Sequence, residues 1–308
     1  MQHLVRLFPF LIAVAAIAGP PLAVLSRNGN LAGPNPRASE ATLKARALHR
    51  VAVRIPDLHW AAIEGDATEV KRLIAAGADV NATETLWGGE QALHWAAYGG
   101  HSGASGATRA LIAAGADVNA RDDDGETPVR EALRPADPSY LALTALLAAG
   151  ADPEAQSSVG SYALHEAVLI EYENGYLAVA LLRIFGADPN SRDSIGATPL
   201  HVAALQPYEQ FTGGLLLNAS IGPHGRAADI NAKDSDGRTP LHWVTSKLRS
   251  VADRRVVEWL IQNGAEVNAT DDWGSTPLDW AAYAGLEELV ELLQSLGGVT
   301  RRVPLSTP

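Results

Sequence analysis

The chain of 308 residues contains no cysteine. This absence excludes a disulfide framework, a thiolate zinc site, a thiol nucleophile and a lipid-modified cysteine. Lysine is scarce, with only 4 among 24 basic residues, and 35 acidic residues give a net charge of −11. That charge argues against general nucleic-acid binding. Hydrophobic residues nevertheless make up 47% of the chain, so it can bury a core and is not a disordered polymer.

The N-terminus carries an apolar run at residues 7–18, which Gly19-Pro20-Pro21 interrupts. Residues 16–18 read Ala-Ile-Ala, the small-x-small pattern that is typical of a signal-peptide cleavage site. We therefore interpret residues 1–25 as a secretory signal peptide. An uncleaved membrane anchor is the alternative, because 19 residues separate the start of the run from Leu25 inclusive.

The segment that follows is basic. Arg27 and Arg37 lie in a linker at 26–38, and positive charge at this position resists translocation, so a chain with neither signal nor anchor is a third reading. Residues 39–54 predict a basic helix that caps the body, although its basic face could instead contact anionic lipid or an acidic partner. A signal before a cysteine-free body favours export to a bacterial periplasm.

Two short patterns recur along the rest of the chain. Gly-Ala-Asp or a close variant is followed by Asn in most copies. These copies begin at Gly77, Gly115, Gly150, Gly186, Ala227 and Gly264. Between them lies a second pattern, Thr-Pro-Leu-His, which is complete at 198–201 and 239–242 and partial in the other copies. The leucine positions recur every 35 to 41 residues.

One copy of this repeat reads as two short helices and a turn. Thr before Pro marks a helix start, because Pro at the first helical position needs no N–H partner. Small pairs such as Ala96-Ala97 let a neighbouring helix approach, and a second helix carries Leu, Ile and Val at helical spacing. Glycine then ends that helix. Such a unit cannot bury its apolar face alone, whereas a stack of copies can.

These motifs resemble the ankyrin repeat, whose signature is T-P-L-H-x-A at a period near 33. The resemblance covers residues 55–297 in about seven units and leaves 298–308 as a tail. It implies an all-α solenoid of stacked helix–turn–helix units with β-turn fingers on one side. It also implies a non-catalytic scaffold that binds a partner protein through the finger tips and inner helices.

Apolar side chains at the finger tips are the sharpest candidates for partner contact. They precede the turn glycine, where the family commonly has Asp or Asn. The set is Trp87, Val159, Ile195 and Trp273. Tyr98 and Tyr283 follow the alanine pairs and should flank the same concave face. A Trp in the inner helix at positions 60, 95, 243 and 280 could be an anchor there, but packing between units is the expected role.

Extra residues fall between the two helices of the five central units. These insertions lie at 100–106, 135–140, 171–176, 206–214 and 246–253. In a solenoid, insertions at one unit position line up along one face, which is often a binding face. Several of them carry aromatic residues, including Tyr140, Tyr172, Tyr176, Tyr208 and Phe211. They form a second candidate surface, and drift in solvent loops is the alternative.

Five of the nine histidines occupy one slot of the repeat. They are His59, His94, His165, His201 and His242. The resemblance implies that this His bonds to the helix start, and we expect that role rather than metal binding, because metal ligands must converge.

We assign no catalytic residue, metal or cofactor. A metal-binding or hydrolytic protein using concave-face His and acids, or an envelope tether, are the alternative functions. The acidic charge favours a partner protein with a basic patch. We also expect the protein to be a monomer.

Overall fold

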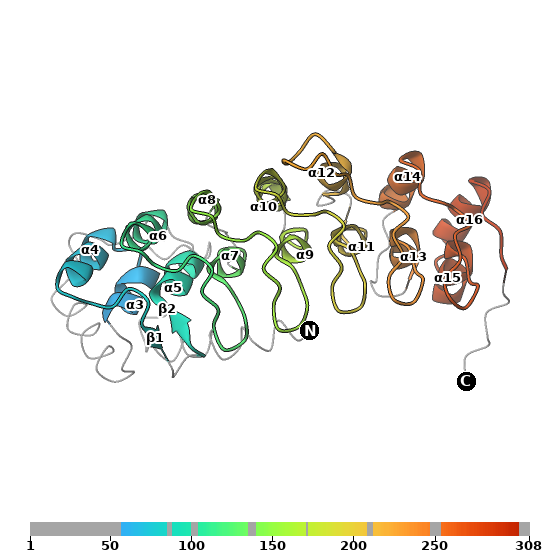
Figure 1. Ribbon diagram of the computed structural model, residues 1–308. Helices are drawn as coiled ribbons and strands as arrows, with labels where there is room; N and C mark the ends of the chain where they lie inside the picture. Colours follow the sequence, from blue (N-terminus) through green and yellow to red (C-terminus); the bar gives the residue numbers. More distant parts are fainter. Residues whose placement is uncertain are drawn as a thin grey trace, which may run out of the picture.

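The computed structural model describes residues 57–84, 88–99, 104–134, 140–170, 172–207, 212–246 and 254–301, the side chains of 104 and 172–174 excepted. The predicted signal peptide or anchor (1–25), linker (26–38) and capping helix (39–54) lie outside these residues. Within them, helices alternate between an inner row and an outer row, and the pairs follow one another in chain order (Figure 1). The predicted solenoid of stacked helix–turn–helix units is confirmed.

Seven helix pairs make up the described part of the chain, and we number them as units 1 to 7. The inner helices are α3 (Asp57–Ile63), α5 (Ala92–Tyr98), α7 (Pro128–Glu131), α9 (Ala163–Ala167), α11 (Pro199–Ala203), α13 (Pro240–Thr245) and α15 (Pro277–Ala284). The outer helices are α4 (Ala67–Ala75), α6 (Ala104–Ala113), α8 (Tyr140–Ala148), α10 (Tyr172–Ile184), α12 (Gly213–Leu217), α14 (Arg254–Gln262) and α16 (Glu287–Ser295).

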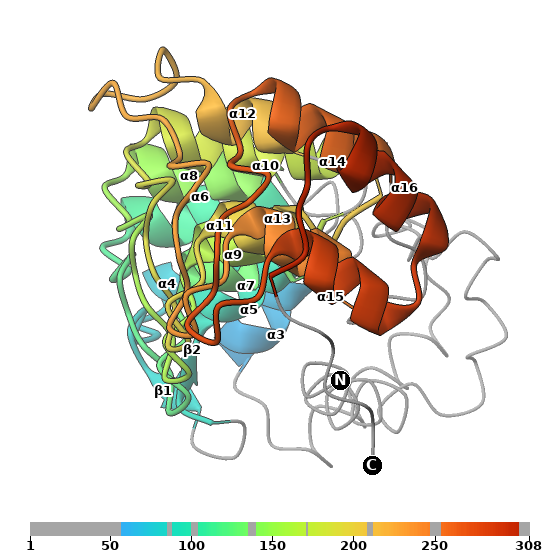
Figure 2. The ribbon, with the colours of Figure 1, turned by 90° about the vertical axis from the view of Figure 1, so that its right-hand side faces the viewer.

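Each inner helix from α5 onward is preceded by a loop that projects away from both helix rows (Figures 1 and 2). We call these loops fingers and number each by the unit whose inner helix it precedes. Finger 2 contains two short antiparallel strands, β1 (Thr83–Glu84) and β2 (Glu90–Gln91), which pair Thr83 with Gln91. The fold is therefore helix-rich with a small β element rather than strictly all-α.

The Thr-Pro pairs start inner helices as the sequence predicts. Thr198 adopts an extended conformation at the N-cap, and Pro199 occupies the first helical position. The backbone N–H of Thr198 donates to Nδ1 of His201 at 3.1 Å. Glycine ends the outer helices in the left-handed region, as at Gly186 with φ of 108°. A side chain with a Cβ is strained there, so glycine is the fitting residue.

The core runs continuously between the two rows of helices. One leucine of each inner helix from unit 4 to unit 6 is fully buried, namely Leu164, Leu200 and Leu241. The alanine pair of unit 2, Ala96 and Ala97, is also fully buried, so the next unit packs directly on the helix backbone. Truncating one such leucine to alanine costs about 2–5 kcal/mol in a packed core. Packing between neighbouring units, rather than within any single unit, therefore stabilises the helices.

A row of asparagines joins neighbouring units at the base of the fingers. Asn231 is typical: its side-chain amide donates to Gly264 O at 3.1 Å, and its Oδ1 accepts from Glu266 N at 2.8 Å. Finger 4 carries Glu154 at this position. Its carboxylate accepts from Asp188 N at 2.9 Å and from the hydroxyl of Ser191 at 2.6 Å. The connection between units thus survives the change of residue.

The array continues past residue 297. Val299 N donates to Asn268 Oδ1 at 2.8 Å, and Thr276 Oγ1 donates to Val299 O at 2.9 Å. Arg301 N donates to Asp279 Oδ2 at 3.1 Å. The first residues of the predicted tail therefore bond to unit 7. The described helices include none with the length and apolar character that a membrane crossing requires.

Candidate binding surface

The histidine row lies inside the stack. In unit 5, Nδ1 of His201 accepts from the N-cap of its own helix, and Nε2 bonds to the carbonyl of Arg238 in the next finger at 3.0 Å. His94 and His242 make the same two kinds of contact, and His59 and His165 contact the next finger. Each histidine thus serves a junction between units. The predicted bond to the helix start is confirmed for His94, His201 and His242, whereas the hydrogen bonds of His59 and His165 go to the next finger.

Burial in this row changes the protonation of the imidazoles. Desolvation lowers the pKa of His94 and of His201 to about 4, because the charged form loses its hydration. Burial also lowers the pKa of His59, His165 and His242. These rings are therefore neutral at pH 7, and each can accept one bond and donate another.

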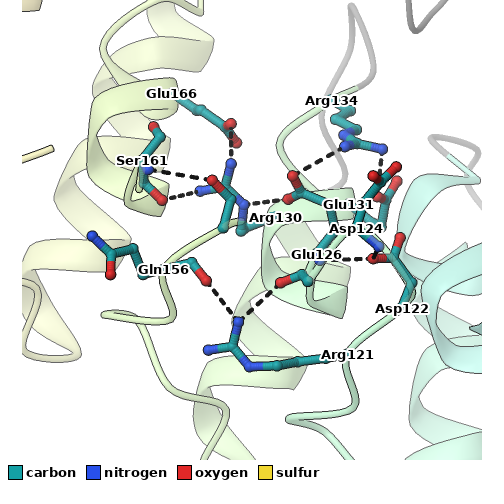
Figure 3. A network of polar contacts seen from close by, with 12 residues as sticks. Arg121, Asp122, Asp124, Glu126, Arg130, Glu131, Arg134, Gln156, Ser161 and Glu166 are labelled. Carbon is teal, nitrogen blue, oxygen red and sulfur yellow. Dashed lines mark hydrogen bonds and ion pairs between the residues drawn. The ribbon is translucent and has the colours of Figure 1, made fainter. Parts of the chain in front are cut away.

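Unit 3 carries Arg130 where the other units have histidine or, in unit 7, Asp279. Arg130 is buried, and its Nη1 donates to Ser161 O of finger 4 at 2.9 Å, in place of the histidine contact (Figure 3). Its guanidinium also pairs with Glu126 of its own finger and with Glu166 on α9. The junction between units 3 and 4 is therefore an ion network instead of a neutral hydrogen bond.

The residue after the histidine slot also changes in the middle of the array. Units 1, 2, 6 and 7 carry tryptophan there, and Trp95 and Trp243 are almost completely buried, so packing is their main role as predicted. Units 3 and 4 carry Glu131 and Glu166 instead. Arg134 pairs with Glu131, with its Nη1 2.6 Å from the carboxylate. An acidic centre on the inner helices thus lies between tryptophan-bearing ends.

Three carboxylates converge at this centre from different elements. Glu90 comes from β2, Asp122 from finger 3 and Glu131 from α7, and one oxygen of each lies within 4.8 Å of the others. Burial raises the pKa of Glu90 to about 7, and the neighbouring Asp122 adds to the rise. Burial also raises the pKa of Asp122 and raises that of Glu131 well above its ordinary value. At neutral pH Glu90 is therefore partly protonated.

Glu166, on the other side of Arg130, behaves in the same way. Its pKa rises to about 7, because burial outweighs the stabilising charge of Arg130. Oxygen ligands of the type that Glu90, Asp122 and Glu131 offer suit a hard metal ion, but Arg134 already pairs with one of them as a counter-charge. The sequence indicated this centre only through two residues that replace tryptophan, and it gave no sign that Glu90 and Asp122 join them.

The finger-tip residues are exposed where the structure describes them. Val159, Ile195 and Trp273 occupy the same slot of fingers 4, 5 and 7 and keep 47%, 54% and 45% of their surface accessible. The same slot carries Asp124 and Asp236 in fingers 3 and 6. Trp87, the predicted tip residue of finger 2, lies outside the described residues. The tips therefore present apolar and acidic groups side by side.

Backbone hydrogen bonds hold neighbouring fingers together. Ser235 N donates to Ile195 O at 2.9 Å, and Asp272 N donates to Asp236 O at 3.0 Å. Gly237 has a φ of 74°, and a Cβ there would lie 2.8 Å from the backbone nitrogen of Asp272. Glycine is thus required for this close approach. The tips are consequently presented on a hydrogen-bonded ribbon rather than on independent loops.

An aromatic cluster closes the C-terminal end of this surface. The guanidinium of Arg238 lies between two indoles, 5.0 Å from the ring centre of Trp273 and 4.7 Å from that of Trp280. Trp280 also donates to Asp271 Oδ2 at 2.9 Å and meets Tyr283 edge to face. These contacts fix the indoles, so they can act as rigid anchors with little loss of side-chain entropy on binding.

Tyr98 and Tyr283 occupy one slot at the end of the inner helices, as the sequence predicts. Tyr98 is half-buried, whereas Tyr283 is 52% exposed. The same slot in unit 4 holds Leu169, which is 49% exposed. The sequence reading missed Leu169, although counting five residues from the leucine of each inner helix would have found it.

The inter-helix insertions are described only in part. Tyr176 is 39% exposed, and Tyr140 is half-buried against the core. The side chain of Tyr172, and the whole of Tyr208 and Phe211, lie outside the described residues. In unit 7, contacts from Trp273 through Arg238 and Trp280 link a finger tip to Tyr283. The insertions lie where each inner helix leads to its outer helix.

Comparisons with known proteins agree with this architecture. A family model described as ankyrin repeats (3 copies) matches residues 58–157, 164–271 and 215–301. The crystal structure of the human ASB11 ankyrin repeat domain is similar, with a TM-score of 0.61 and 26% identity. That likeness covers 82% of this chain and 100% of the other chain. A search of curated proteins found no match to the chain.

The chain therefore belongs to the ankyrin-repeat family. Ankyrin repeats are generally protein–protein interaction modules, and proteins built from them are typically non-enzymatic scaffolds. The family predicted from the repeat signature and the fold predicted from its physics are both confirmed.

Proposed function

We propose that this protein is a non-catalytic scaffold that binds a partner protein through its finger tips and inner helices. The observation that carries the proposal is the row of exposed apolar tips, Val159, Ile195 and Trp273, on fingers that are hydrogen-bonded to one another. Large apolar groups on a rigid, solvent-facing ribbon cost little entropy on binding and lose water when they are covered. Tyr283 and Leu169 extend the same surface along the inner helices.

The partner carries a basic patch on the surface that meets the fingers. The net charge of −11 supports this choice, as do the acids at the tips of fingers 3 and 6. Complementary charge of this kind speeds association and is screened by salt. Binding should therefore weaken as the salt concentration rises, and binding that is indifferent to salt would contradict the electrostatic part.

Site-specific photo-crosslinking in cells tests the surface. A photoreactive amino acid is placed at position 159, 195 or 273, and matched exposed positions on outer helices, Ala75 and Gln262, serve as controls. We expect one partner protein to be captured from the finger positions and not from the two controls. Equal capture from all five positions, or capture from the controls alone, would overturn the assignment of the surface.

The inter-helix insertions form a second, smaller candidate surface in this proposal. The exposed Tyr176 supports it among the described side chains. We also propose that the protein is a monomer and that it is exported to a bacterial periplasm. The export proposal rests on the apolar run and the Ala-Ile-Ala pattern in residues 1–25. N-terminal sequencing of the mature protein tests the export proposal, and an intact Met1 in the secreted or membrane fraction would contradict cleavage.

A further inference from the structure

The outer helices expose a face on the side of the molecule away from the inner helices and fingers (Figure 2). Their residues can be aligned by the glycine that ends each unit, at 77, 115, 150, 186, 264 and 297. Three slots, nine, six and two residues before that glycine, are exposed or half-buried in each of these six units. These outer slots recur on every long outer helix. The residues that occupy them can therefore be compared from unit to unit.

Units 3 and 4 differ from the others in these slots. Four outer helices carry at least one charged side chain there. Their outer slots read Thr68, Lys71 and Ala75 on α4; Gly106, Arg109 and Ala113 on α6; Arg255, Glu258 and Gln262 on α14; and Glu288, Glu291 and Ser295 on α16. The outer slots of α8 and α10 hold Leu141, Thr144, Ala148, Leu177, Ala180 and Ile184. We call these six residues the outer strip, and none of them carries a charge.

The three largest side chains of the outer strip face solvent. Leu141 is 63% exposed, Leu177 is 49% exposed and Ile184 is 55% exposed. Leu141 and Leu177 hold the same slot on helices that are neighbours in the stack (Figure 1). A helix such as α8, which reads YLALTALLA and is apolar on every side, is normally covered on all sides. The strip therefore has the character of an interface.

The dimensions of the strip select the occupant. Its first and last slots are seven residues apart, which is about 10 Å along a helix axis, and neighbouring helix axes lie about 8–10 Å apart. Such a patch is well below the ~800 Å² per partner that a stable dimer buries. It matches instead a single helix that presents apolar residues at i, i+3 or i+4, and i+7.

Charge at the border of the strip adds a preference. Arg109, which holds the middle outer slot of α6, is exposed beside α8. An acidic residue along the edge of a bound helix would lie near this guanidinium. We propose that the outer strip binds one amphipathic helix of a partner protein, apolar toward α8 and α10 and acidic along the edge nearest Arg109. The chain would then hold two partners, one on each side of the solenoid.

A model peptide tests this proposal with the full chain. The probe is a fluorescein-labelled helical peptide of about 18 residues, or five turns, with leucines on one face and glutamates along one edge. The control peptide has the same composition with the leucines distributed around the helix. We expect fluorescence anisotropy to show binding of the amphipathic peptide at least tenfold tighter than of the control. Absence of binding, or equal binding of both peptides, overturns the proposal.

Matched variants locate the binding site. Leu141→Glu/Ile184→Glu should weaken peptide binding at least tenfold, whereas Thr68→Glu places the same charge in an outer slot of α4 and should leave it unchanged. Arg109→Glu should weaken it two- to threefold. All these side chains are exposed or at the surface, and circular dichroism checks that each variant keeps its helix content. Equal binding by the double variant and Thr68→Glu overturns the assignment.

Two other occupants are distinguished by separate measurements. Sedimentation of the wild type as a dimer that Leu141→Glu dissociates would make a second copy the occupant and overturn the partner helix. Strip-dependent flotation with phosphatidylcholine vesicles would make a lipid surface the occupant, with the same consequence. Trp273→Ala should leave peptide binding unchanged, so this test is independent of whether the finger tips bind a protein.

Discussion

Units 5 and 6 connect to their next neighbours through a buried neutral histidine, whereas unit 3 uses Arg130 in the same slot. His201 and Arg130 both bond to a backbone carbonyl of the next finger, Arg238 O and Ser161 O respectively. The geometry of the junction is therefore conserved while its chemistry changes. Arg130 is paired with the carboxylates of Glu126 and Glu166. The centre of the inner-helix row is therefore ionic, whereas its ends carry tryptophan.

This difference shows what the repeat fold conserves. The hydrogen bond between neighbouring units is kept, whereas the residue that forms it can change. Glu154 shows the same principle at the base of finger 4, where a carboxylate accepts the backbone bond that asparagine accepts elsewhere. The exchanged chemistry changes how each junction responds to mutation and to pH. Both responses can be measured, and they test whether the comparison is correct.

Replacing Arg130 should have the largest effect on stability. Arg130→Met leaves the half-buried Glu166 without its ion-pair partner and leaves the buried Glu126 with only Arg134, at 3.5 Å. Breaking a buried ion pair in this way typically costs about 3–5 kcal/mol. Urea unfolding followed by circular dichroism measures the loss. Adding Glu126→Gln and Glu166→Gln to the same variant should recover most of it, because the stranded charges are gone. A loss below about 1 kcal/mol for Arg130→Met would show that the network contributes little.

Replacing the histidine of unit 5 should cost less. His201→Ala leaves the Thr198 N–H and the Arg238 carbonyl without their buried partner, a loss of about 1–3 kcal/mol for the unsatisfied groups. The same urea titration measures it, and Val202→Ala, one residue along the same helix, controls for general loss of packing. If His201→Ala costs as much as Arg130→Met, the ionic junction is not the more sensitive of the two.

The two kinds of junction should respond to pH in opposite directions. The pKa of His201 is lowered to about 4, so its contribution to stability is complete above about 6.5 and is lost as pH falls toward 4. The pKa values of Glu90 and Glu166 are raised to about 7, so their contribution is complete below about 4.5 and is lost as pH rises through 7.

Hydrogen exchange, corrected for the intrinsic rate, can separate these responses by helix. Between pH 7.5 and 5.5, the free energy of opening should fall for α13, which lies between two histidine junctions. It should rise for α7, because the raised pKa values of Glu90, Glu131 and Glu166 around it outweigh the opposing response of one histidine, His94. Glu131→Gln should reduce the rise at α7 without changing α13. Parallel changes in both helices would contradict the assignment of protons to the carboxylates.

The smallest effect is expected at the base of finger 4. Glu154→Asn restores the residue that other units use, and we expect a change within about 0.5 kcal/mol, as is usual for a surface substitution. Asn231→Ala removes the corresponding connection in finger 6 and should cost about 1 kcal/mol. Thermal unfolding distinguishes the two. A loss above about 1 kcal/mol for Glu154→Asn would mean that this junction has adapted specifically to glutamate.

The sequence predicts the fold well because the same helix-start and helix-end motifs recur in successive units. Thr198-Pro199 starts a helix, Gly186 ends one, and the buried histidine row follows from the common slot. The tip residues Val159, Ile195 and Trp273 could also be placed, since each precedes a turn glycine. The structure confirms their exposure and adds the backbone hydrogen bonds that join the fingers.

The acidic centre could not be predicted in the same way. Glu90, Asp122 and Glu131 belong to a strand, a finger and a helix, and their convergence depends on how unit 2 stacks on unit 3. Glu131 and Glu166 depart from the tryptophan of other units, which is a visible signal, but a departure alone does not show which groups surround it. Leu169 is visible in the sequence, because it lies five residues after Leu164, as Tyr283 does after Leu278.

The affinity of the partner captured by photo-crosslinking for finger-tip variants tests the central claim most directly. Ile195→Ala/Trp273→Ala should weaken binding at least tenfold, as expected when two exposed anchors are removed, while the melting temperature stays that of the wild type. Ala75→Ser/Gln262→Ala, on the outer helices, should bind as the wild type does. Affinity within twofold of the wild type for the finger-tip variant would contradict the account.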